Sequence, residues 1–246
     1  MEVFGTEIDF NKQEGYFLNA DCMEGMRAFS DKYFDLAIVD PIYGDVTQGG
    51  YTKGMGGRRT KNSASAFRIY NTSIWDQQKT PKEYFDELFR VSKNQIIWGG
   101  NYFVESINKD SQCWLVWDKD RCEGKSYADG ELAWTSFNKA LRIFKYKWDG
   151  MLQENMKDKE WRIHPTQKPV ALYEWILSRY AKKGDIILDT HVGSASSLIA
   201  CHKMGFNYVG FELDENYYKL AKDRLDQETA QMDFYDLVRT NAETQN

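Results

Sequence analysis

The chain has 246 residues, of which 32 are Lys or Arg and 37 are Asp or Glu, so its net charge is −5 at neutral pH. This acidic balance argues against a uniformly basic nucleic-acid-binding protein, and any contact with a polyanion must come from a local cluster of cations. The length fits one α/β domain spanning residues 1–246, with room for a small inserted region but not for a second full domain.

Targeting signals and cysteine usage indicate where the protein is located and whether it binds metal or forms disulfides. We find no signal peptide and no apolar run of 18 or more residues, so we expect neither secretion nor membrane spanning and predict a cytoplasmic location. The four cysteines include no Cys-x-x-Cys pair and no histidine at ligand spacing. We therefore expect reduced thiols, with no disulfide framework and no metal site.

The first strongly predicted element is a buried strand that ends in an acid. The stretch Phe34–Tyr43 reads FDLAIVDPIY, and its apolar run Leu36–Val39 favours a strand interior. Asp40, Pro41 and Tyr43 follow at the carboxyl end, where open α/β sheets present catalytic groups. The alternative is an ordinary strand end with a proline that stops the pairing.

A basic stretch follows directly. Residues 46–75 contain no acid and five cations, and five glycines lie between residues 49 and 57. This composition predicts a flexible loop in which Arg58, Arg59 and Lys61 contact the phosphates of DNA. A solvated surface loop is the alternative.

Helix and strand signals alternate through the middle of the chain. We expect a helix from Thr80-Pro81 to about Lys93, and strands at Gln95–Trp98 and Cys113–Trp117. The segments Glu131–Phe137 and Leu141–Trp148 are interpreted as two strands of a hairpin.

This hairpin interleaves basic and aromatic side chains, as nucleic-acid surfaces do. Lys139 in the turn and Arg142 on the second strand are candidates for phosphate contacts. Packing of the aromatic rings in the core is an equal alternative. Residues 105–162 accordingly form a small inserted recognition region in this interpretation.

The C-terminal part predicts a nucleoside-binding half-sheet. Glu212 lies 19 residues after Gly193, close to the spacing at which an acid binds ribose hydroxyls in βαβ units. The three-glycine fingerprint of dinucleotide-binding dehydrogenases is missing. The expected elements are a helix from Pro169 to about Lys182, a strand at Ile186–Leu188, a loop at 189–196, a helix at Ser197–Met204 capped by Gly205, and a strand at Tyr208–Phe211.

Three segments resemble motifs of one enzyme family. Asp40-Pro41-Ile42-Tyr43 resembles the Asp-Pro-Pro-Tyr motif of amino-methyltransferases, which methylate the exocyclic amine of adenine or cytosine. The loop Asp189–Ser196 resembles the one through which these enzymes hold S-adenosyl-L-methionine, and His164–Val170 resembles the motif that precedes it in permuted members. With the catalytic motif first and the cofactor loop last, the order is similar to that of the β group.

The resemblance implies a circularly permuted Rossmann-like methyltransferase fold, with a mostly parallel mixed sheet and helices on both faces. The chain also departs from the pattern in places. Ile42 replaces a proline, Thr190 and His191 replace proline and phenylalanine, and Ala195 replaces a glycine. Ala195 fits this loop only if its φ is negative.

The resemblance further implies a role for each motif. The Asp40 carboxylate and the Pro41 carbonyl would accept hydrogen bonds from the target amine, and Tyr43 would stack on a base flipped out of the duplex. Asp21 would contact the adenine of the cofactor, and Lys168 its methionine carboxylate unless it is an ordinary lysine in solvent. The predicted cofactor-binding residues are Asp21, Lys168, Asp189, His191, Gly193, Ser194, Ala195 and Glu212.

Within the family pattern, Asp at position 40 favours adenine. We therefore expect an adenine-N6 methyltransferase that acts on double-stranded DNA, of the kind found in restriction-modification systems. The alternatives are an N4-cytosine DNA or RNA adenine methyltransferase, and a nucleic-acid-binding homologue that has lost catalysis. The target sequence cannot be read, and a homodimer remains an open alternative to a monomer.

Overall fold

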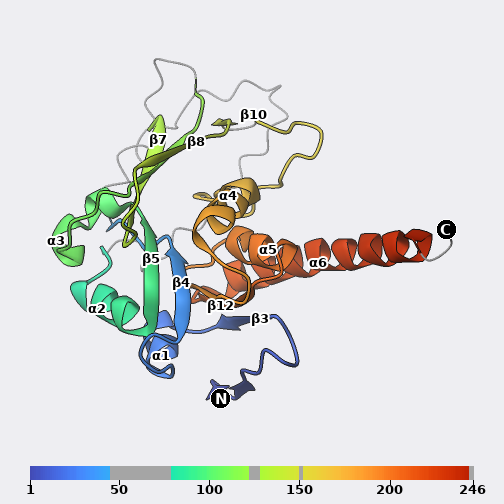
Figure 1. Cartoon of the computed structure of the whole chain (residues 1–246), viewed down its shortest axis with the longest axis horizontal. Coiled ribbons are helices and arrows are strands. Elements are labelled where there is room, and N and C mark those ends of the chain that lie inside the picture. The colour runs from blue at the N-terminus through green and yellow to red at the C-terminus, as the bar shows by residue number, and fades with distance from the viewer. Residues whose placement is uncertain (45–78, 122–127, 150–151, 244–246) are drawn as a thin grey trace, which may run out of the picture.

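The computed structural model describes residues 1–44, 79–121, 128–149 and 152–243, with the backbone alone for 231–243. The basic stretch with Arg58, Arg59 and Lys61 lies outside the described residues. Figure 1 shows a central twisted sheet with helices on either side, and a C-terminal helix that extends well beyond the sheet.

The sheet has eight strands in the order β3-β12-β11-β4-β5-β7-β6-β8. Neighbours from β3 to β5 run parallel, and β7 is antiparallel to both β5 and β6. The predicted mostly parallel mixed sheet is therefore confirmed. The strands are β3 (Gly15–Asn19), β4 (Phe34–Val39), β5 (Ser92–Trp98), β6 (Leu115–Asp118), β7 (Gly130–Thr135), β8 (Arg142–Lys145), β11 (Ile186–Asp189) and β12 (Asn207–Glu212).

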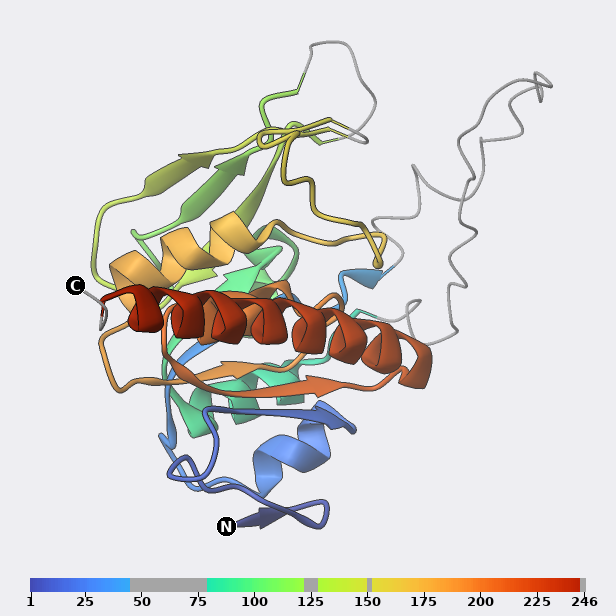
Figure 2. The same cartoon turned by 90° about the vertical axis from the view of Figure 1, so that its right-hand side faces the viewer.

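Helices cover both faces of this sheet, as Figures 1 and 2 show. Strand β4 explains why: Leu36 and Ile38 pack into one core, and Ala37 and Val39 into the other, so both faces of the strand are apolar. One face carries α1 (Cys22–Arg27), α2 (Lys82–Val91) and α3 (Val104–Ile107), and the other carries α4 (Val170–Tyr180), α5 (Ser196–Lys203) and α6 (Glu215–Glu243).

Short elements complete the described chain. A 3-10 turn (Gly100–Tyr102) follows β5, and two small antiparallel pairs lie outside the main sheet: β1 (Glu2–Val3) with β2 (Thr6–Glu7), and β9 (Trp148–Asp149) with β10 (Leu152–Gln153). None of the helices among the described residues is long and apolar enough to cross a membrane.

The hairpin interpretation of residues 131–148 is wrong. Strand β6 lies between β7 and β8, and its Leu115 pairs with Ala133 on one side and with Arg142 on the other. Leu115 and Trp117 of β6 are almost fully buried, and a place between two neighbouring strands covers them better than a place at the edge of the sheet would. Residues 105–162 thus add three strands to the main sheet.

The aromatic side chains of β8 support the alternative of core packing. The ring of Phe144 stacks on Tyr146, with centroids 5.5 Å apart, and lies 5.2 Å from the ring of Trp175 on α4. Ile143, on the opposite face of the strand, is 62% exposed. The alternation of side chains along this strand was predicted correctly, but its aromatic face belongs to the core.

Strands β6, β7 and β8 extend past the end of the parallel strands. Trp98, the last residue of β5, pairs with Ala133 of β7, which in turn pairs with Leu115, the first residue of β6. These strands therefore rise beyond the carboxyl ends of β4 and β5, as the upper part of Figure 1 shows. They form a wall beside the edge that bears Asp40.

Candidate active site at the carboxyl edge of the sheet

Four neighbouring parallel strands each lead into an acidic residue. In the order β3, β12, β11 and β4, the acids are Asp21, Glu212, Asp189 and Asp40. Parallel strands share the edge at which their carboxyl ends emerge, and ligands of open α/β sheets bind there. The structure thus brings the predicted catalytic acid and the predicted cofactor-binding acids to one edge.

The side chain of Asp40 is held by two donors. The Tyr43 hydroxyl donates to Oδ1, and the Lys168 ammonium donates to Oδ2. The Tyr43 ring is fixed as well: it stacks on Tyr102, with centroids 5.0 Å apart, and a Cβ at Gly99 would lie 2.1 Å from its Cε1 atom. The predicted catalytic side chains therefore have defined positions.

The backbone after Pro41 is also fixed, although Ile42 stands where the family motif has a second proline. The Ile42 carbonyl accepts hydrogen bonds from both the amide and the hydroxyl of Thr80, each 3.1 Å long. These two bonds restrain the loop, so the loss of the proline does not leave it free.

Thr190 and His191, which both depart from the cofactor-loop motif, contact each other. The Thr190 hydroxyl lies 2.6 Å from the Tyr84 hydroxyl and 2.9 Å from His191 Nδ1, and the Tyr84 and His191 rings meet edge to face. Burial lowers the pKa of His191 to about 4, so its imidazole is neutral at pH 7. Threonine and histidine together hold the beginning of this loop by hydrogen bonding.

Asp189 anchors the same loop. Its carboxylate accepts a hydrogen bond from the His191 amide, 3.0 Å away, and another from the Ser197 hydroxyl. Burial raises the pKa of Asp189 to about 7. Since both hydrogen bonds are internal, Asp189 shapes the loop that the sequence assigned to the cofactor.

The expectation of a negative φ at Ala195 is wrong. Ala195 has φ 62° and ψ 16°, the left-handed conformation, and is fully buried just before α5. The loop demands this turn: the Ala195 amide bonds to the Val192 carbonyl, and its own carbonyl accepts from Ile199 at the start of the helix. These bonds hold a conformation that costs a non-glycine residue about 1–2 kcal/mol.

Glu212 and Asp21 have backbone partners of their own. The two carboxylate oxygens of Glu212 accept from the amides of Gly193, at 2.9 Å, and Asp214, at 3.0 Å. Asp21 caps α1 by accepting from the amides of Met23 and Glu24. A carboxylate oxygen has more than one acceptor position, so these bonds leave room for hydroxyl or amine donors.

One residue that sequence reasoning missed links the cofactor loop to α6. Arg224 donates to the Ser194 carbonyl at 2.7 Å, to the Ser196 hydroxyl at 2.9 Å and to the Glu160 carboxylate at 2.7 Å. Glu160 also accepts from the Val170 amide at the start of α4. The predicted cofactor residue Ser194 is therefore fixed through its backbone.

Lys168 is not a solvated lysine. Its side chain is only 2% exposed, and its ammonium lies between the carboxylates of Asp40 and Glu131. Glu131 in turn pairs with Lys119 at 2.5 Å. The sequence did not predict Glu131 and Lys119 because Glu131 lies on β7 and Lys119 directly follows β6, both far along the chain from either motif.

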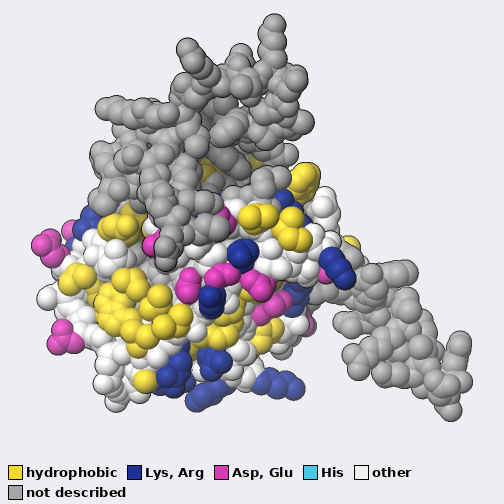
Figure 3. All heavy atoms as spheres, turned by 90° about the horizontal axis from the view of Figure 1, so that it is seen from above, with side chains coloured by type: hydrophobic (Ala, Val, Ile, Leu, Met, Phe, Trp, Pro, Cys, Tyr) yellow, Lys and Arg dark blue, Asp and Glu magenta, His cyan; other side chains and the backbone are white. Residues whose placement is uncertain are grey.

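The predicted DNA-contacting residues do not gather with Asp40. Lys139 donates to the Arg179 carbonyl at 3.1 Å, beside the C-terminus of α4. Arg142 lies four strands from β4, roughly 19 Å away at the usual strand spacing. On the face seen from above, basic and acidic side chains lie side by side, and its described part shows no continuous basic surface (Figure 3).

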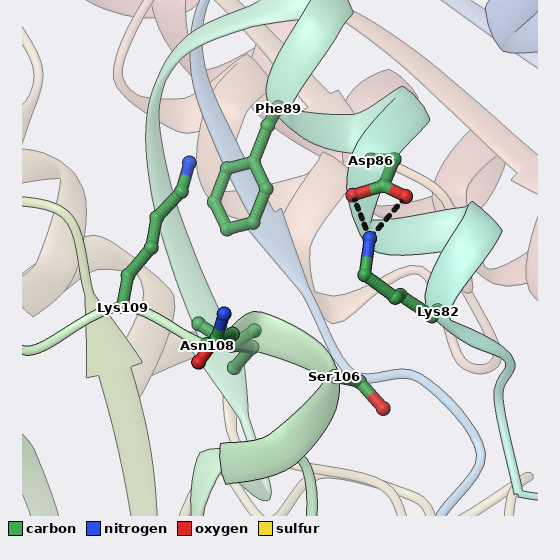
Figure 4. A pocket seen from close by; sticks show the side chains of 7 residues that line it. Lys82, Asp86, Phe89, Ser106, Asn108 and Lys109 are labelled. Atoms are coloured by element: carbon green, nitrogen blue, oxygen red, sulfur yellow. Dashed lines mark hydrogen bonds and ion pairs between the residues drawn. The ribbon is translucent and has the colours of Figure 1, made fainter.

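A pocket of about 240 Å³ lies elsewhere, between α2 and the residues that end α3 (Figure 4). Its lining contains none of the predicted site residues. Lys82 bonds to Asp86 within it, and Lys109 lies over the Phe89 ring, 3.4 Å from its centroid. The predicted site residues therefore lie at the carboxyl ends of the parallel strands and not in this pocket.

A known protein family matches a large part of this chain. A model of the family N6_N4_Mtase, described as DNA methylase, matches residues 61–223, more than half of the chain. The chain belongs to this DNA methylase family. The match includes β5, β11, β12 and the wall strands, and begins after the Asp40 motif.

Curated relatives are similar over part of their length. The type II methyltransferase M2.DpnII of Streptococcus pneumoniae is 28% identical over 165 residues, which are 66% of this chain and 53% of the relative. The type II methyltransferase M2.LlaDCHI of Lactococcus lactis subsp. cremoris is 27% identical over 161 residues, 65% of this chain and 51% of the relative. This chain spans about half the length of the relatives it matches.

Solved structures share the fold over most of this chain. M1.HpyAVI, in a complex with SAM, has a TM-score of 0.52 at 21% identity, over 85% of this chain and 99% of that one. The cytosine-N4-specific PvuII DNA methyltransferase has a TM-score of 0.54 at 10% identity, over 89% and 92% of the two chains. The predicted Rossmann-like methyltransferase fold is confirmed.

Proposed function

We propose that this protein of the DNA methylase family transfers a methyl group from S-adenosyl-L-methionine to the N6 amine of adenine in double-stranded DNA. The observation that carries the proposal is the edge at which β4 and β11 lie side by side, since it sets the Asp40 motif beside the loop of Asp189. The motif order, catalytic before cofactor, assigns the chain to the permuted β group in this proposal.

The residues at this edge fit the chemical groups of S-adenosyl-L-methionine. Glu212, whose side chain lies in a buried setting at the end of β12, offers acceptors for the ribose hydroxyls. Asp21 offers an acceptor for the amine of the cofactor's adenine, and Lys168 is a cation for its carboxylate. When bound, the cofactor supplies an electrophilic methyl group, and a positively charged sulfonium is favoured near several carboxylates.

The residues of the catalytic motif orient the nucleophile. The exocyclic amine of adenine is a weak nucleophile because its lone pair is delocalised into the ring. An acceptor for its N–H bond, the Asp40 carboxylate, favours the pyramidal nitrogen from which attack occurs, and the Pro41 carbonyl is the proposed second acceptor. The Tyr43 ring and its neighbour Tyr102 offer aromatic surface to a flipped base.

Adenine is preferred over cytosine in this proposal because position 40 is Asp. The similarity to the cytosine-N4-specific PvuII enzyme is one of fold, so it gives no specific reason to prefer cytosine. We further propose that residues 46–75 contact the phosphates of the duplex and that residues 105–162 take part in recognition, within one domain.

The test is methyl transfer from tritiated S-adenosyl-L-methionine to unmethylated duplex DNA, followed by separation of the nucleosides. We expect label in N6-methyl-2′-deoxyadenosine, and a loss of about 10²- to 10³-fold in rate for Asp40→Ala with cofactor binding retained. Label in N4-methyl-2′-deoxycytidine, or transfer only to RNA, would reassign the substrate. Cofactor binding without transfer to either nucleic acid would indicate an inactive homologue.

A further inference from the structure

Four charged side chains alternate in sign beside the catalytic motif. The Lys119 ammonium lies 2.5 Å from Glu131 Oε1, Glu131 Oε2 lies 3.0 Å from the Lys168 ammonium, and Lys168 bonds to Asp40 Oδ2. We call this arrangement the four-charge row. Its formal charges sum to zero, and its members come from four separate segments of the chain.

The side chains of the four-charge row are largely buried. Side-chain exposure is 12% for Lys119, 24% for Glu131, 2% for Lys168 and 17% for Asp40. Screening by solvent is weak at such positions, so each charge acts strongly on its neighbours. Loss of the Glu131 charge should therefore alter how Lys168 binds Asp40.

The two central members of the row, Glu131 and Lys168, are stabilised in their charged forms. Burial raises the pKa of Glu131, but the ammonium groups of Lys168 and Lys119 lower it by more, to well below its usual value. Burial lowers the pKa of Lys168, yet the Asp40 and Glu131 carboxylates outweigh this and raise it. The pairing is thus an ionic one.

Lys168 and the target amine make competing demands on Asp40. In the proposed mechanism Asp40 accepts a hydrogen bond from the amine, whereas here both its oxygens already accept, one of them from Lys168. An ammonium held by Asp40 alone would draw the carboxylate away from the substrate. A second carboxylate on the far side of Lys168 reduces that pull.

We propose that Glu131 is a positioning residue that, balanced by Lys119, holds Lys168 and so keeps the Asp40 carboxylate available to the target amine. This inference rests on the proposed function, and it concerns side chains that neither motif contains. Glu131 is suited to the task because β7 belongs to the wall beyond the strand ends, which brings its carboxylate alongside the Asp40 edge.

The test compares Glu131→Gln, Lys119→Gln and the double variant in steady-state methylation of duplex DNA. Glu131→Gln keeps the side-chain size but leaves the row with a charge of +1, so kcat should fall at least about 10-fold. In Glu131→Gln the unpaired Lys119 ammonium also repels Lys168 towards Asp40. The double variant removes this repulsion and should regain at least about threefold of that loss, as coupled neighbours do. Lys119→Gln keeps Glu131 on Lys168 and should stay within about threefold of the wild-type kcat.

The KM for the cofactor serves as a second readout. Glu131→Gln leaves Lys168 in place with less neutralisation, so this KM should not rise. Thermal unfolding of each variant shows whether it is folded. If Glu131→Gln is not, the double variant should still be slower than Lys119→Gln, because the two differ only in the Glu131 carboxylate.

Three results would overturn the inference: a wild-type kcat for Glu131→Gln, a double variant no faster than Glu131→Gln, or a tenfold loss in Lys119→Gln. These results differ from a failure of the proposed function. If the wild-type protein transfers no methyl group, or if Asp40→Ala is fully active, then the role of Asp40 itself is wrong.

Discussion

Gly99→Ala should displace Tyr43 of the proposed catalytic motif, and the structure provides a matched control for it. Gly99 has φ 66°, and a Cβ there would lie 2.1 Å from Cε1 and 2.4 Å from Cζ of Tyr43. Gly205 has nearly the same φ, 68°, and a Cβ at that position would have nothing within 4 Å. Gly205→Ala therefore measures the backbone cost alone, while Gly99→Ala adds the collision with the ring.

The expected magnitudes follow from these two terms. A left-handed conformation costs alanine about 1–2 kcal/mol, and the stiffer unfolded chain offsets about 0.4–1 kcal/mol of it. Gly205→Ala should thus destabilise by about 1 kcal/mol. Crowding in a packed site adds about 1–3 kcal/mol, so Gly99→Ala should lose about 2–4 kcal/mol.

Thermal unfolding and methyl transfer together measure both effects. At roughly 2–4 °C per kcal/mol for a chain of this size, Tm should fall by about 2–4 °C in Gly205→Ala and by more in Gly99→Ala. Moving the Tyr43 ring disturbs its bond to Asp40, so Gly99→Ala should also lose at least about 10-fold in rate, whereas Gly205→Ala should keep its rate. Equal Tm values and wild-type rates in both variants would refute this reasoning.

Three further predictions concern the cofactor, DNA and pH. Glu212→Ala should weaken cofactor binding by about 1.5–3 kcal/mol in calorimetry, the usual worth of a hydrogen bond to a charged group, and unchanged affinity would remove Glu212 from the site. Changing Arg58, Arg59 and Lys61 together to Ala should reduce the slope of log K for DNA against log salt by about 2.7, at roughly 0.9 per phosphate contact; an unaltered slope would make the stretch a solvated loop. Because the pKa of His191 is lowered to about 4, its neutral form stabilises the fold above pH 6.5, and this contribution is lost as the pH falls towards 4. Tm should therefore fall less steeply between pH 6.5 and 4 in His191→Gln, and equal slopes would contradict a buried neutral imidazole.

Much of the fold could be predicted because its signals are local. The strand that ends at Asp40 and the one that leads to Glu212 are apolar runs followed by an acid, and α4 and α5 begin and end within about two residues of their expected positions. Parallel strands with both faces buried leave this mark in the sequence itself. Their shared edge then follows from the architecture.

The missed features depend on contacts between distant segments. Strand β6 separates β7 from β8, and no local pattern reveals which strand takes a central place. The pairing of Glu131 with Lys168 likewise arises only when β7 and the residues before α4 meet. The prediction for Ala195 was wrong because its left-handed φ is imposed by the hydrogen bonds of the loop rather than by alanine's own preference.

The strand order also determines when the active edge can form during synthesis. Leu36 of β4 pairs with Ile187 of β11, and Gly15 of β3 pairs with Tyr208 of β12. These N-terminal strands therefore cannot complete their pairing until the C-terminal strands have been synthesised. A growing chain can pair β4 with β5 soon after both leave the ribosome, but β4 keeps one open edge until β11 arrives. Such long-range closure slows folding and exposes a strand that could pair with other chains. Asp40, the proposed catalytic acid, is thus among the first candidate site residues to be made, and the neighbouring strand β11 with Asp189 is added near the end of synthesis.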